Sequence, residues 1–217
     1  MPQRPKAEVR DAILSAAADT FAEQGFQGAK LTDIVVRAGT SIGNLYKYFA
    51  NKDELFEAFL PPGFEAQLTR LIRARVEALR AETDALSLGP EHPYRHAADE
   101  LSRFVFEHRE RVVFLLCRAE GTAHAGFADA TVRLLVRLAL HYARAAHPDF
   151  EATPSARRAL TRIYRAYVAT LGVLLQEERS EGALREAVAL QTTYHLSGLE
   201  ALFRRSEPRR IEGERFV

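Results

Sequence analysis

The 217-residue sequence has little of several features that mark particular protein classes. Its single cysteine, Cys117, excludes an intramolecular disulfide and is typical of a reducing compartment. No window approaches the ~20 consecutive apolar residues of a membrane-spanning helix, and the basic start MPQRPKAEVRDAIL lacks the apolar core of a secretory signal. The net charge of +1 argues against bulk electrostatic attraction to nucleic acid. We therefore expect a cytoplasmic protein that does not enter a membrane.

Enzyme motifs are also missing from the sequence. It contains no Gly-rich phosphate loop and no nucleophile elbow. The histidines lack metal-ligand spacing, and although His92 and His96 are close, Pro93 argues against a helix there. Cys117 and His124 could be a nucleophile and a base, but the spacing identifies no third group to orient them. We expect no enzyme, no cofactor and no bound metal.

Apolar residues recur with helical spacing along most of the chain, and no run alternates as a strand would. The sequence therefore predicts an all-α fold. Outside the central motif described next, helices are expected at residues 7–24, 64–82, 97–108, 112–120, 127–146, 155–178 and 183–204, with loops at 84–94 and 147–155.

The stretch KLTDIVVRAGTSIGNLYKYFANK, residues 30–52, has the pattern of two short helices around a corner. Leu31, Ile34 and Val35 recur at helical spacing, so the first segment has one buried face. Gly39 then ends this helix, because glycine tolerates the left-handed backbone of a tight turn. Two roles are open at the start of this helix. Either Thr32 caps it, or Lys30 contacts a phosphate in place of a cap.

The second segment is expected to bury one apolar face and expose a polar one. Thr40 or Ser41 can cap it. Its buried positions are predicted to be Ile42, Leu45 and Phe49. The outward residues are expected to be Ser41, Gly43, Asn44, Lys47 and Tyr48. Together with the helix expected before them, the two segments predict a three-helix module with a helix-turn-helix, whose second helix enters the DNA major groove.

Base and phosphate contacts can be assigned within this motif. Ser41 and Asn44 can hydrogen-bond base edges, and Gly43 allows the backbone to approach the groove. Asn51 with Glu54 has capping-box spacing, which places the Lys52 cation at a helix N-terminus. A phosphate bound there would relieve that mismatch, so Lys52 is a candidate DNA contact.

The motif resembles the DNA-binding signature of TetR/AcrR-type regulators. The resemblance rests on Asp33-Ile34, Ala38-Gly39, GNLYKYF at 43–49 and NKDELF at 51–56, and it covers roughly the first quarter of the chain. It implies that Thr40, Tyr46 and Lys52 hold phosphates, and that Lys47 and Tyr48 lie at the groove edge. The alternative is that the two tyrosines pack the module and that Lys47 is merely solvated.

The same resemblance implies a domain arrangement and a ligand. We expect a DNA-binding domain at 1–52, a helical effector-binding and dimerisation domain at 53–205, and a tail at 206–217. Residues 2–6 are expected to form an arm that reaches DNA or stays solvated. Pro61-Pro62-Gly63 interrupts a helix that usually runs on in such proteins, so it is a candidate hinge or elbow.

The effector is an unidentified small molecule, and its pocket is expected among polar groups with apolar neighbours. The candidates are Cys117, Arg118, Glu120, His124 and Tyr164. The alternative is that Arg118 and Glu120 are simply exposed and that Tyr164 packs a core.

The last two helices carry apolar positions that could pack against a second copy as a four-helix bundle. These are Ile163, Tyr167, Thr170, Leu171, Leu174, Leu184, Val188, Leu199, Leu202 and Phe203. The alternative is an intrachain core.

Together these features predict a ligand-responsive transcriptional repressor that binds a palindromic operator as a homodimer. Two other interpretations stay open: a helical small-molecule-binding or adaptor protein without specific DNA binding, and a redox sensor based on Cys117.

Overall fold

The computed structural model describes residues 6–79, 82, 84, 86–178 and 180–204. Every regular element in these residues is helical, so the all-α prediction is confirmed. Most of the expected N-terminal arm and the tail at 206–217 lie outside the described residues. The elements are α1 (Lys6–Gly28), α2 (Leu31–Arg37), α3 (Ile42–Leu45), α4 (Lys52–Phe59), α5 (Phe64–Glu77), α6 (Pro93–Glu107), α7 (Arg109–Val113), the π-helical turn η1 (Phe114–Arg118), α8 (Phe127–Ala146), α9 (Pro154–Glu177) and α10 (Glu181–Phe203).

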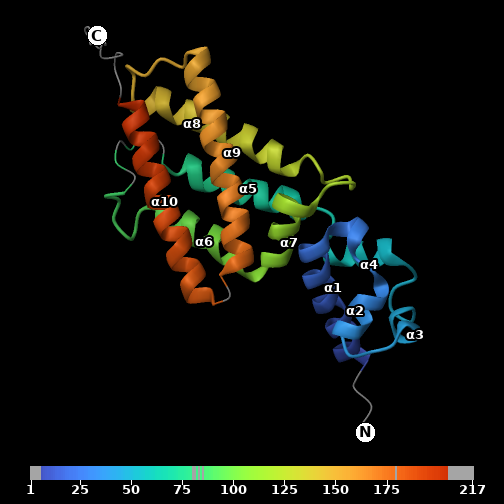
Figure 1. Cartoon of the computed structure of the whole chain (residues 1–217). Helices are drawn as coiled ribbons and strands as arrows, with labels where there is room; N and C mark the ends of the chain where they lie inside the picture. The colour runs from blue at the N-terminus through green and yellow to red at the C-terminus, as the bar shows by residue number, and fades with distance from the viewer. Residues whose placement is uncertain (1–5, 80–81, 83, 85, 179, 205–217) are drawn as a thin grey trace, which may run out of the picture.

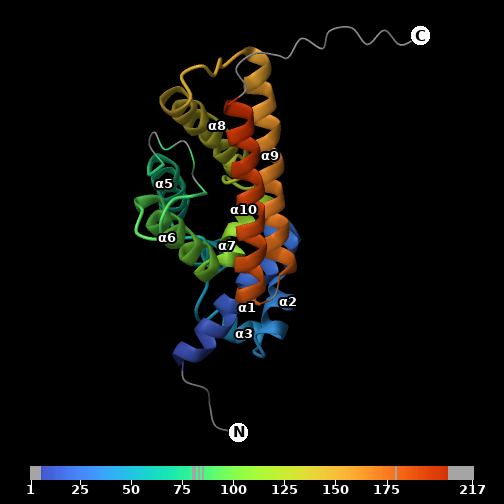
Figure 2. The same ribbon diagram turned by 90° about the vertical axis from the view of Figure 1, so that its left-hand side faces the viewer.

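The helices form two regions of unequal size (Figure 1). Helices α1–α4 gather at one end of the molecule, and α5–α10 make up the rest. Figure 2 shows α9 and α10 running side by side along the larger region. We call α1–α4 the DNA-binding module and α5–α10 the larger domain.

Helix α1 bends at Gly25, directly after the expected helix end at residue 24. Gly25 has the left-handed φ of 70°, and helical structure resumes as far as Gly28. Phe26 folds back so that its ring stacks 6.1 Å from the ring of Phe21. The expected end at residue 24 thus coincides with the kink, and the extra turn after it was not predicted.

An aromatic cluster joins the module to the larger domain. Phe56 and Phe59 of α4 lie 5.3 Å from the Phe21 ring of α1, measured between centroids. The same two rings lie 5.2 and 5.7 Å from Phe114 of η1. Because the buried cluster is continuous here, α4 belongs to both cores, and the boundary after residue 52 stays a prediction.

Helix α6 begins earlier than expected. Pro93 is its first residue, and the Nδ1 atom of His92 accepts a hydrogen bond of 3.1 Å from the Tyr94 amide. The expectation that Pro93 excludes a helix was wrong, because a proline at the first position has no amide hydrogen to leave unsatisfied. Helix α5, in turn, ends at Glu77, short of the expected end at 82.

The predicted helix at 112–120 is two elements, α7 and the wider turn of η1. The π turn brings Cys117 against α9 at Gly172. A Cβ atom at position 172 would lie 2.5 Å from the Cys117 sulfur, so this close approach requires glycine. Helix α8 has the predicted bounds, and Thr153 caps α9 ahead of Pro154.

Most of the apolar residues expected to pack a second copy lie inside the chain instead. Tyr167, Leu184, Leu199 and Phe203 are buried in the two core clusters. Leu171 and Val188 line a cavity described below. The large apolar side chains exposed on α9 and α10 are Ile163, Val173, Leu190 and Tyr194.

Candidate nucleic-acid interface and internal cavities

The corner between α2 and α3 has helix-turn-helix geometry. Gly39 adopts a φ of 62°, and the next residue but one, Ser41, is the N-cap of α3. The Ser41 hydroxyl accepts a hydrogen bond of 3.2 Å from the Asn44 amide, which decides between Thr40 and Ser41 as the cap. At α2 the N-cap is Lys30, which makes no side-chain cap bond, and the Thr32 hydroxyl donates to Asp33 instead.

Helix α3 is short, and this changes which of its side chains face solvent. Leu45 and Phe49 are buried as predicted, whereas Ile42 is 40% exposed. Tyr48, expected to face outward, is half-buried against the core, and Tyr46 is 54% exposed. The prediction failed at Ile42 because it is the first residue of a single helical turn. Exposed there, Ile42 can make the apolar contact that a thymine methyl offers.

Asn44 is the centre of a small polar network on α3. Its Nδ2 atom donates to the Thr40 hydroxyl at 3.1 Å, and its Oδ1 atom accepts from the Lys47 ammonium at 2.8 Å. Ser41 and Gly43 beside it are exposed. The network orders the polar surface of α3. It also means that Asn44 must exchange these partners for a base edge in order to read sequence.

Lys52, the first residue of α4, has an unusual environment. The Asn51 carboxamide accepts a hydrogen bond from the Glu54 amide at 2.8 Å, so the expected cap is present. Glu54 in turn accepts from the Ala50 amide and not from the cap residue itself. The Lys52 ammonium lies 4.6 Å from the centroid of the Phe26 ring, and its pKa is lowered chiefly by burial, which Asp53 opposes. A cation so placed remains beside a helix N-terminus, where a phosphate would bind favourably.

Arg37, a further cation of the module, forms ion pairs with residues of α1. Its guanidinium donates to both carboxylate oxygens of Glu23 on α1, the shorter bond being 2.8 Å. Asp19 lies 3.8 Å from the same group. This pairing fixes α2 against α1, so Arg37 holds the module together.

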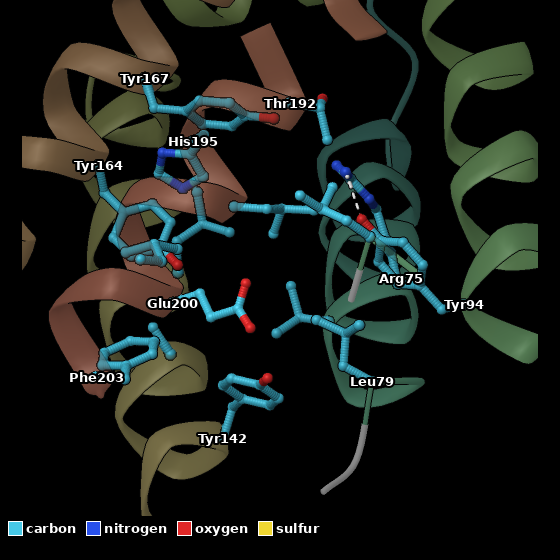
Figure 3. A pocket seen from close by; sticks show the side chains of 16 residues that line it. Arg75, Leu79, Tyr94, Tyr142, Tyr164, Tyr167, Thr192, His195, Glu200 and Phe203 are labelled. Atoms are coloured by element: carbon cyan, nitrogen blue, oxygen red, sulfur yellow. Dashed lines mark hydrogen bonds between the residues drawn. The ribbon is translucent and has the colours of Figure 1, made fainter. Parts of the chain in front are cut away.

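The larger domain contains a cavity of about 70 Å³ that opens to solvent between α5, α6, α8, α9 and α10 (Figure 3). Tyrosine rings and aliphatic side chains form most of its wall. Arg75 of α5 and Glu200 of α10 approach it from opposite sides. The Arg75 guanidinium donates to the Tyr94 hydroxyl at 3.0 Å.

His195 is neutral in this wall. Its imidazole stacks on Tyr167 with centroids 4.0 Å apart and meets the edge of Tyr164 at 4.9 Å. Burial, together with the Arg75 charge, lowers the pKa of His195 to about 4. Burial raises the pKa of the Tyr164 hydroxyl, so both groups are uncharged near neutral pH.

A second cavity of about 120 Å³, also partly open, adjoins the first. Arg75, Val76, Leu135 and Tyr167 line both. The remaining side chains of the second cavity are almost all hydrocarbon, and they include Val112 of α7 and Leu116 of η1. The larger domain thus holds a polar, aromatic compartment joined to an apolar one.

Of the sequence candidates for the ligand pocket, only Tyr164 lines either of these cavities. Arg118 and Glu120 are exposed, and half-buried Cys117 faces Gly172 and Gln176. His124 lies in a shallow surface groove, where its ring pairs with Glu65 at 2.9 Å. Burial raises the pKa of the Cys117 thiol, which disfavours the reactive thiolate that a redox sensor needs.

The sequence contained a signal for the residues that were missed. Leu68, Ile72, Arg75 and Leu79 follow helical spacing, so Arg75 occupies an apolar position of α5. His195 does the same between Leu184 and Leu199 of α10. A charged or polar residue within an apolar stripe points to an interior polar site.

A helix-turn-helix with an exposed polar surface defines the class of the protein as DNA-binding. Residues 13–59 match the family described as "Bacterial regulatory proteins, tetR family". This match covers the DNA-binding module, which is thus similar to the DNA-binding domain of TetR-type regulators.

Curated relatives match over the same region. The transcriptional activator FasR of Mycolicibacterium smegmatis is 35% identical over 80 residues, which is 37% of this chain and 35% of FasR. The transcriptional regulator RutR of Escherichia coli is 49% identical over 51 residues, 24% of each chain. The alignments thus span about a quarter to a third of these relatives, and their names are those of transcription factors and not of enzymes.

Among solved structures, a TetR-family transcriptional regulator from Pectobacterium atrosepticum matches this chain. It covers 90% of this chain and 97% of its own, at 21% identity and a TM-score of 0.44. In the part of the chain that the structure describes, no helix is long and apolar enough to cross a membrane.

Proposed function

We propose that this protein is a ligand-responsive transcriptional repressor that binds a palindromic operator as a homodimer. The observation that carries the proposal is the exposed surface of α3, where Ser41, Ile42, Gly43 and Lys47 surround the Asn44 network on a rigidly packed three-helix support. Such a surface fits a major groove. Lys30 and Lys52 lie at helix starts on the same module, where they suit phosphates.

The homodimer is supported by the outer face of α9 and α10. Leu190 is 67% exposed and Tyr194 is 78% exposed on α10, and Ile163 and Val173 are exposed on α9. Exposed side chains of this size on two adjacent long helices are typical of an association surface. A second copy would complete a four-helix bundle and supply the second recognition helix for a two-fold operator.

The release mechanism is supported by the contacts between the cavities and the module. Leu116 of η1 lines the apolar cavity, and its neighbour Phe114 packs on Phe56 and Phe59 of α4. The Arg111 guanidinium of α7 donates to the Phe59 carbonyl at the end of α4. A ligand that prefers one arrangement of these helices therefore changes the affinity for the operator.

Fluorescence anisotropy with DNA from upstream of the protein's own gene tests the proposal. Scrambled DNA of equal length is the control, and two salt concentrations separate specific from electrostatic binding. We expect a preference of about a thousandfold or more for the upstream DNA, and a dimeric mass at micromolar concentration. Equally weak, salt-sensitive binding to both DNAs, together with retained ligand binding, would favour the second candidate. That candidate is a helical small-molecule-binding protein without specific DNA binding. The two internal cavities are the observation that supports it.

A further inference from the structure

We infer that the ligand of the larger domain is an amphipathic organic acid, held by its anionic group at Arg75 with its hydrocarbon body in the apolar cavity. This inference rests on the proposed function, because it names the effector of that same site. Its first support is the position of Arg75, which stands where the two cavities meet and lines both of them.

The guanidinium of Arg75 is incompletely satisfied by the protein. It has five N–H donors; one donates to the Tyr94 hydroxyl at 3.0 Å, and the Tyr167 hydroxyl also lies close enough to favour its charged form. No carboxylate of the described residues lies within 4.0 Å of it as an ion-pair partner. An interior guanidinium without a counter-ion is costly, and a carboxylate that binds in bidentate fashion offsets that cost.

The other polar groups of the wall decide where an anion can lie. Glu200 repels an anion from the opposite end of the first cavity, and its carboxylate is held by Arg204 at 2.5 Å. At the Arg75 end, Figure 3 shows Tyr167 and Thr192 near the guanidinium, where their hydroxyls can donate to an anion. His195 is neutral near pH 7, so Arg75 supplies the positive charge there.

The second cavity determines the chemical character of the rest of the ligand. Beyond Arg75 the second cavity is bounded mostly by aliphatic and aromatic side chains from α5–α10 and η1, with Ser102, Thr131 and Tyr167 as its hydroxyl-bearing members. A second polar group on the ligand would lose its hydration there without adequate replacement. A single acidic group at one end of a hydrocarbon body matches the charge and the apolar wall together.

Isothermal titration of the full-length protein with decanoate, 1-decanol and decylamine, each below its aggregation concentration, tests the inference. The three probes share a chain and differ only in the charge of the head group. We expect decanoate to bind about 10- to 100-fold more tightly than decanol, the range of one charge-assisted contact, and decylamine to bind weakest. Equal affinities for decanoate and decanol would overturn the inference.

Variants locate the anionic group. Arg75→Met should reduce the decanoate affinity to that of decanol, whereas Arg75→Lys should keep part of the difference. Glu200→Gln is the matched control in the same wall, and it should leave decanoate binding unchanged or tighter. If Arg75→Met fails to fold, Tyr94→Phe, which removes the hydroxyl that orients Arg75, should still narrow the decanoate–decanol gap. Undiminished discrimination in a folded Arg75→Met protein would refute the site.

Parallel anisotropy with operator DNA separates this inference from the proposed function. If decanoate binds but leaves the DNA affinity unchanged, the inferred class of ligand stands and its role as an effector is refuted. If the protein binds DNA specifically but does not discriminate decanoate from decanol, the proposed regulatory function stands and the inference of an acidic ligand is refuted.

Discussion

The DNA-binding module and the larger domain organise their polar groups over different distances along the chain. In the module, Asn44 hydrogen-bonds to both Thr40 and Lys47, and all three lie within residues 40–47. In the larger domain, Arg75 meets Tyr94 from another helix, and His195 meets Tyr164 and Tyr167 across the helix pair. A local site leaves a readable motif, whereas a site assembled from several helices does not.

The two regions nevertheless share a core, and the largest expected effect tests that link. Phe21→Ala should lower the free energy of unfolding by about 3–5 kcal/mol, because the ring is fully buried against Phe56 and Phe59, which also contact Phe114. Urea unfolding followed by circular dichroism measures the loss. Val36→Ala is the control, since Val36 is 78% exposed and should change little. Two separate transitions would show that the module and the larger domain fold independently.

The second prediction concerns His195 and applies to the larger domain alone. The pKa of His195 falls from 6.5 in the unfolded chain to about 4 in the folded one. Between these values the unfolded state binds a proton that the folded state does not. The contribution of neutral His195 to the free energy of unfolding is therefore fully present above pH 6.5. It is lost as the pH falls towards 4, by an amount on the order of 3 kcal/mol.

Urea unfolding of the wild type and His195→Gln across this pH range measures that loss. Because burial also lowers the pKa of His108 and His147, the difference between the two proteins isolates His195. The decrease in the free energy of unfolding at low pH should be smaller in His195→Gln. His96 is exposed, so His96→Gln should follow the wild type. Parallel curves for all three proteins would contradict the assignment.

The third prediction separates the two kinds of contact within the module. Asn44→Ala should reduce the preference for operator over scrambled DNA by about tenfold or more, because it removes the base-reading amide and releases Thr40 and Lys47. Lys52→Ala should weaken binding to both DNAs alike and lower the slope of log affinity against log salt by about 0.9. Anisotropy titrations at several salt concentrations measure both. An equal loss of specific and non-specific binding in the two variants would refute this division.

The smallest effect on DNA affinity is expected at the connection between the regions. Pro61 and Pro62 lie between the end of α4 and Gly63, whose φ of 88° starts α5. Replacing both prolines with alanine should loosen this elbow, so ligand-induced release changes while the affinity without ligand stays within about twofold. The ratio of operator affinities with and without ligand is the quantity to measure. An unaltered ratio would exclude the elbow from the coupling.

The sequence by itself determined the helical class, the turn at Gly39, the cap at Asn51 and the bounds of α8. These features depend on residues within one or two turns of each other, so their pattern is visible in the chain. Sequence could also have shown that Arg75 and His195 interrupt apolar stripes.

Only the tertiary structure decided that Ile42 is exposed, that Tyr167, Leu184 and Phe203 are intrachain core, and that the π turn of η1 requires Gly172. It alone placed Arg75 at the junction of two cavities and left Arg118 and Glu120 at the surface. The physical reason is that burial and electrostatic environment depend on which helix faces which, and helical spacing is the same whether the partner is another helix of this chain or a second copy.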